Sequence, residues 1–101
     1  MSKSYSEAES LLKNKLTRKV AGNTYLEKYS DRDYIAVRFH WTEVVRYFPN
    51  GDVQLNSGGY RTATTKARMN EFSPATVYQK DFQWYVNGGE EFRDNMVISA
   101  A

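Results

Sequence analysis

The chain has 101 residues, of which 41% are hydrophobic and 15% aromatic, with 14 Lys or Arg, 12 Asp or Glu and one histidine. This length suits a single domain, residues 1–101, because two cores of half that size would each be marginal without disulfides or metals. The lack of cysteine excludes disulfides, thiolate nucleophiles and zinc–cysteine sites, and a single histidine excludes a metal site built on several histidines.

The N-terminal segment "SYSEAESLLKNKL" predicts an amphipathic helix. Ser6 and Glu9 have the spacing of a capping box, and the apolar residues that follow recur on one helical face: Ala8, Leu11, Leu12 and Leu16. A helix with so few apolar residues has marginal stability by itself. We therefore expect it to dock on a sheet or on a second copy of the chain, as a homodimer.

From Thr24 onward the pattern favours strands. The runs "TYLEKY" and "YIAVRF" flank the polar turn "SDRD". Odd positions are apolar from Ile35 to Trp41, and after Glu43 they are apolar again at Val45 and Tyr47, which indicates either one long strand or two strands broken near Thr42. We favour one strand with a bend or bulge, because the apolar residues keep to odd positions on both sides of Glu43.

Turn residues divide the rest of the chain. Asn50-Gly51 predicts a tight hairpin with positive φ angles, and "SGG" predicts a reversal before a short strand, "YRTAT". A helix of about Thr65–Phe72 follows, with Thr64 as its cap, so that Thr64→Ala is expected to cost about 1 kcal/mol. Two strands around a turn at Asp81, an "NGG" reversal and the strand "MVIS" complete the chain.

These elements predict an α+β fold: an N-terminal helix and an antiparallel β-meander of about five to seven strands with one inserted short helix. The expected core residues are Ile35, Val37, Phe39, Val45, Val53, Leu55, Met69, Phe72, Trp84 and Ile98.

The sequence also suggests one candidate site for an anion or a nucleotide. Twelve of the 14 Lys or Arg residues precede Ser73, and a helix start attracts anions. The proposed ligands are Arg38, His40, Thr64, Thr65, Lys66 and Arg68, with Arg46, Tyr60, Arg61 and Asn70 as secondary residues. The segment is not a P-loop, because "YRTA" separates its glycines from Lys66.

A plain turn, a capped helix and a solvated sheet face explain the same residues, and we favour that interpretation. The anion site requires the helix start and the Arg38 strand to share one concave surface. If they lie on opposite sides of the domain, "SGG" is only a turn.

The central third of the chain resembles a group of small bacteriophage-encoded proteins. The resemblance rests on a first motif, Ile35, Val37, Arg38, Phe39, His40 and Thr42, and on a second, "LNSGGYRTATTKARMN", from Leu55 to Asn70. The resemblance implies a phage accessory protein made in the host cytoplasm, and it implies no particular activity. Tyr60 replaces a tryptophan common in the group, and Trp41 occupies a position that is usually small or polar.

We therefore expect a non-catalytic phage accessory protein that binds and modulates a host or defence factor, which is a protein, a nucleotide signal or RNA. It needs no cofactor or metal and does not enter a membrane, since the sequence has no long apolar run. The alternative is a small metal-free ribonuclease with His40 as its base, assisted by Arg38, Lys66 and a tyrosine. A third hypothesis is a minor virion or assembly component.

Overall fold

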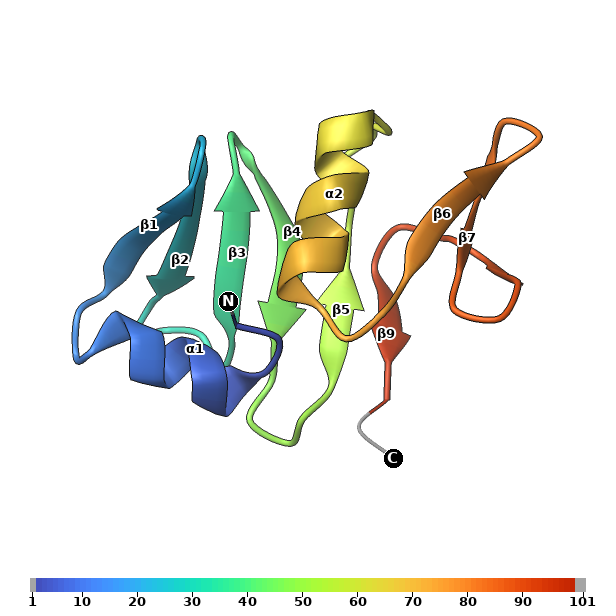
Figure 1. Cartoon of the computed structure of the whole chain (residues 1–101). Coiled ribbons are helices and arrows are strands. Elements are labelled where there is room, and N and C mark those ends of the chain that lie inside the picture. Colours follow the sequence, from blue (N-terminus) through green and yellow to red (C-terminus); the bar gives the residue numbers. More distant parts are fainter. Residues whose placement is uncertain (1, 100–101) are drawn as a thin grey trace.

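Both helices lie on the same face of a six-stranded antiparallel sheet (Figure 1). Residues 2–99, which the computed structural model describes, form the following elements in chain order: α1 (Tyr5–Leu12), β1 (Thr17–Ala21), β2 (Thr24–Lys28), β3 (Ile35–Phe39), β4 (Thr42–Tyr47), β5 (Val53–Leu55), α2 (Ala63–Phe72), β6 (Val77–Lys80), β7 (Gln83–Val86), β8 (Glu90–Glu91) and β9 (Met96–Ile98). The main sheet has the order β1-β2-β3-β4-β5-β9, and β6-β7-β8 form a second sheet next to α2. The predicted α+β meander with an inserted helix is confirmed.

Helix α1 begins two residues earlier than the predicted capping box. Ser4 is the N-cap, and its hydroxyl accepts a hydrogen bond of 3.3 Å from the amide of Glu7. The expected box of Ser6 and Glu9 is therefore wrong, and Glu9 instead pairs with Lys28 of β2 at 2.9 Å. Leu16 lies beyond the helix and is 66% exposed. The strand that follows, β1, was not predicted.

The long strand predicted through Trp41 is in fact two strands, β3 and β4, joined by a tight turn at His40 and Trp41. His40 has φ 54°, and its amide donates to the carbonyl of Asn23 at 3.0 Å. The two-residue turn moves the buried face from odd to even positions, and a bulge at Val44 moves it back. The two shifts cancel, which is why the sequence reads as one strand.

Two further turns differ from their predictions. Only Gly51 of the Asn50-Gly51 pair has a positive φ, of 99°, and its amide closes the turn on the carbonyl of Phe48 at 2.9 Å. The expected strand "YRTAT" is absent, because Thr62 caps α2 and the helix starts at Ala63. Thr64 lies inside the first helical turn, so its expected role as the cap is wrong.

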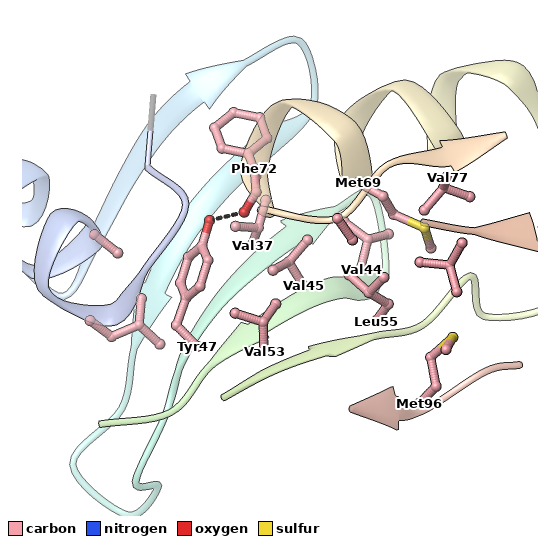
Figure 2. Close-up of a cluster of buried hydrophobic side chains, with 14 of the residues drawn as sticks. Val37, Val44, Val45, Tyr47, Val53, Leu55, Met69, Phe72, Val77 and Met96 are labelled. Carbon is pink, nitrogen blue, oxygen red and sulfur yellow. Dashed lines mark hydrogen bonds between the residues drawn. The ribbon is translucent and has the colours of Figure 1, made fainter. Parts of the chain in front are cut away.

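The main core lies between the sheet and the helices (Figure 2). Eight of the ten expected core residues are buried, while Phe39 and Ile98 pack against the core and remain partly exposed. Tyr47 crosses this core, and its hydroxyl reaches the carbonyl oxygens of Phe72 and Ser2. The tyrosine thereby ties β4 to the end of α2 and to the N-terminal segment.

Residues 56–95 form an excursion from the main sheet between β5 and β9. The excursion contains α2 and the small sheet, whose hairpin turns at Asp81 and Phe82, both with positive φ. β9 then pairs with β5 from Val53↔Ile98 to Leu55↔Met96. This excursion brings the start of α2 beside the β3–β4 hairpin.

Candidate functional site

A pocket of about 470 Å³ lies between the tip of the β3–β4 hairpin and the loop that enters α2; we call it the helix-start pocket. It is lined by residues 39–42, Val44, Ser57, Tyr60, Thr62, Thr64 and Thr65. This lining combines aromatic rings and hydroxyl groups, and it includes no carboxylate, lysine or arginine. The pocket therefore suits an uncharged, partly apolar group better than a phosphate.

The hairpin turn sets one wall of the pocket. The ring of His40 packs on Phe39, with centroids 4.4 Å apart, and Trp41 at the tip is 93% exposed. One unbroken strand would place Trp41 on the same face as Phe39, but the turn reverses the chain there and leaves the ring exposed. Single exposed apolar side chains are common on protein surfaces, so the exposure of Trp41 is informative only because its ring borders the pocket.

The "SGG" reversal sets the opposite wall. A Cβ atom at Gly58, which has φ +63°, would lie 2.4 Å from Oγ1 of Thr42, so only glycine allows this close approach. Ser57 is held from the other side, because the carboxylate of Asp94 accepts from its amide at 2.8 Å and from its hydroxyl at 2.7 Å. The glycine pair is thus a packed turn.

The helix start satisfies much of its own hydrogen-bonding capacity. The Thr62 hydroxyl accepts from the amide of Thr65 at 3.2 Å and lies 3.0 Å from the Thr65 hydroxyl. Thr65 is buried, whereas Thr64 is exposed and faces the pocket. The Thr62 hydroxyl thereby takes the place that an anion would occupy at this end of the helix.

Arg38 and Arg46 project from the face of the sheet away from the helices, which we call the open sheet face. There Arg38 pairs with Glu27 and Arg46 pairs with Glu43, at 3.0 and 2.8 Å. Burial opposes ionisation of Glu27, but hydrogen bonds from Arg38 and Tyr29 outweigh it and hold the pKa of that carboxyl below its usual value. Both arginines are thus ion-paired within the protein, and Glu43 also pairs with Arg32.

The remaining predicted residues lie around α2, away from the pocket. Arg68 donates to the hydroxyl of Thr24 at 2.9 Å and pairs with Glu71 at 2.7 Å. Lys66 lies 5.8 Å from the centroid of the Trp84 ring, and Arg61 lies over the same ring at 5.7 Å.

Asn70 has a structural role at the other end of α2. Its side-chain amide exchanges two hydrogen bonds with the main chain of Val77, of 2.9 and 2.6 Å. This pair fixes β6, and with it the small sheet, to the helix.

The structure thus brings together only part of the predicted site. His40, Tyr60, Thr64 and Thr65 line one pocket. The expected shared surface with Arg38 does not form, because Arg38 and Arg46 lie on the open sheet face, and Lys66, Arg61, Arg68 and Asn70 point toward other elements.

Sequence reasoning missed the other pocket residues, among them Trp41, Thr42, Ser57 and Thr62. The one available signal was the tryptophan at a position that is usually small or polar in the resembling phage proteins. The other three become pocket residues only through the hairpin turn and the reversal at the glycine pair.

Among residues 2–99, no helix is long and apolar enough to span a bilayer, and no group of three or more His, Cys, Asp or Glu is placed to hold a metal ion. The family described as Kyanoviridae Gp96 protein matches residues 1–99. The chain matches no curated protein and no solved structure. The family match identifies a small bacteriophage protein of an accessory or structural kind.

Proposed function

The chain belongs to the Kyanoviridae Gp96 protein family, and we propose that it is a non-catalytic accessory protein that binds and modulates a host or defence protein. The observation that carries this proposal is the helix-start pocket with Trp41 at its rim. Tryptophan and tyrosine are the residues most enriched at the energetic centres of protein interfaces. Here Trp41 is 93% exposed and Tyr60 is 67% exposed beside the same pocket.

The chemistry of the pocket favours a protein ligand over a phosphate. A phosphate site uses cations or free amides, whereas this lining offers rings and hydroxyl groups. An apolar side chain of a partner would fill the pocket, with Trp41 and Tyr60 packing around it. Threonine and serine hydroxyls could then bond to the main chain of the partner.

Catalysis has less support from the geometry. His40 is the histidine that the ribonuclease hypothesis uses as its base, yet Arg38 and Lys66, its proposed helpers, point away from the pocket. The Arg38 guanidinium donates to the main-chain carbonyl of His40 at 2.5 Å, but it is paired with Glu27 and does not line the pocket. An imidazole without a cation beside it in the pocket stabilises a phosphoryl transition state poorly. The pocket therefore supports recognition better than reaction.

The proposal is tested by affinity capture from infected host cells, with the captured proteins, nucleotides and RNA identified by mass spectrometry. The bait is the whole chain, as wild type, Trp41→Ser, Tyr60→Ser, or Phe82→Ser as a matched control, since Phe82 is 97% exposed outside the pocket. A captured protein is then purified and titrated. We expect both pocket variants to bind at least about tenfold more weakly and Phe82→Ser to bind like wild type.

Three results would contradict the proposal. One is equal capture by all four baits, another is capture of a nucleotide or RNA without a protein, and the third is no capture at all. Mass spectrometry of purified phage particles tests the remaining hypothesis, because a virion component would be present in every particle.

A further inference from the structure

The positive charge of the chain is concentrated in one short segment. Lys13, Lys15, Arg18 and Lys19 lie within seven residues, and no acid occurs between Glu9 and Glu27. Because the chain has 14 cations and 12 acids, ten cations and twelve acids remain elsewhere. The net charge of +2 therefore comes entirely from this segment, which we call the basic edge.

The fold gathers these four side chains around one depression. Helix α1 ends at Leu12, and the chain turns back through Lys13, whose φ is 49°, into the edge strand β1. The depression has a volume of about 450 Å³ and is lined by all four cations, by Thr17 and by the last residues of α1. All four cationic side chains are exposed.

The basic edge differs from the open sheet face in how its charges are balanced. On the open sheet face Arg32, Arg38 and Arg46 all pair with glutamates. No cation of the basic edge pairs with an acid among residues 2–99; Arg18 donates to the carbonyl of Leu11 at 2.7 Å. Lysines on an edge strand discourage aggregation, and cations favour a helix C-terminus, but neither effect requires four of them around one depression.

We infer that the basic edge binds the phosphate backbone of duplex nucleic acid. Regularly spaced phosphates complement a cluster of unpaired cations, and binding gains free energy from released counterions. No aromatic ring lines the depression, so it cannot stack unpaired bases as single-strand binders do. The exposed Leu16 is a single apolar side chain and not the apolar face that a membrane-surface helix needs.

This surface lies apart from the helix-start pocket. Figure 1 shows the turn between α1 and β1 at the lower left, whereas the tip of the β3–β4 hairpin and the start of α2 lie at the top. The inference is therefore independent of the proposed function, and variants of one surface leave the other intact.

The test measures binding of a fluorescent DNA duplex by anisotropy between about 50 and about 200 mM salt. Four phosphate contacts predict that the affinity of the wild type falls about 100-fold over this range, and two contacts predict about tenfold. For the double variant Lys15→Gln/Lys19→Gln, which keeps two of the four cations, we expect the affinity to fall only about tenfold over this range. The control Lys80→Gln/Arg93→Gln removes the same charge elsewhere and is expected to keep the wild-type dependence.

Several outcomes would overturn the inference. Equal losses in the two double variants would show a response to net charge alone. The absence of binding at about 50 mM salt would exclude the surface altogether. Tighter binding to a single strand or to anionic lipid vesicles than to the duplex would assign the basic edge to a different partner. Circular dichroism of each variant checks that the fold is retained.

Discussion

The hydroxyl of Tyr47 in β4 bonds to the main-chain carbonyl of Phe72, the last residue of α2 (Figure 2). Twenty-five residues separate the two in sequence. The same hydroxyl lies 3.0 Å from the carbonyl of Ser2 and 3.1 Å from the Ser2 hydroxyl, so one phenol joins three segments. Burial raises the pKa of Tyr47, which keeps the phenol protonated and able to donate.

Tyr47→Phe should therefore destabilise the protein. The change leaves buried polar groups of Phe72 and Ser2 without their partner, and we expect a loss of about 1 to 3 kcal/mol in the free energy of unfolding. Urea denaturation measures this, with Tyr60→Phe as the control because its ring is exposed. A loss in Tyr47→Phe no larger than in the control would show that the bond contributes nothing to stability.

The start of α2 provides a second prediction, which distinguishes two neighbouring threonines. Thr62→Ala removes the hydroxyl that accepts from the amide of Thr65, so we expect a loss of about 1 kcal/mol. Thr64→Ala should change stability by less than about 0.5 kcal/mol, because its side chain is exposed. Thermal unfolding of both variants checks this, and the reverse order would restore Thr64 as the cap.

The glycine pair allows a test of the packed turn. Gly59→Ala introduces only backbone strain, at φ +84°, and should cost about 1 kcal/mol. Gly58→Ala also forces its Cβ against Thr42, so we expect at least about 1 kcal/mol more. Adding Thr42→Ala should remove most of this extra loss, because it deletes Oγ1 and Cγ2, which would lie 2.4 and 2.8 Å from the new Cβ, and leaves only the Thr42 Cβ at 3.2 Å. If the double variant shows no such rescue, the contact is not the cause.

Acid should weaken the open sheet face. The pKa of Glu27 in the folded protein lies below its ordinary value of 4.5. The ionised carboxylate therefore stabilises the fold fully above pH 4.5, and this stabilisation is lost as the pH falls through the lowered pKa. Glu27→Gln should therefore cost about 1 kcal/mol near neutral pH, and this difference from wild type should shrink in acid. Urea denaturation across the pH range measures it. The exposed Glu90→Gln serves as the control, and a difference independent of pH would contradict the assignment.

Labelled RNA in the presence of EDTA separates recognition from metal-free catalysis. We expect the RNA to remain intact with the wild type, because His40 has no cation beside it in the helix-start pocket. His40→Ala should behave identically. Cleavage by the wild type that is lost in His40→Ala would instead establish the ribonuclease hypothesis.

The sequence predicted local structure best where turn residues or the spacing of apolar residues along one element decide it. The turn at Asp81, the inserted helix ending at Phe72, and the buried faces of β3 and β5 followed from turn residues and from spacing along one element. The N-caps were missed by two residues in both helices, because several serines and threonines compete for the role and only the geometry of the first turn selects one.

The sequence by itself determined the fold class, most of the core and the unbalanced charge of residues 13–19, because periodicity and charge are properties of neighbouring residues. Tertiary structure decided which side chains meet. A two-residue turn and one bulge cancel in the alternation of β3 and β4, so the sequence could not show that Trp41 sits exposed at a tip. Strand alternation would place Arg38 and His40 on one face, because they are two positions apart. β3 ends at Phe39 and His40 lies in the turn with φ 54°, so Arg38 lies on the open sheet face and His40 lines the helix-start pocket.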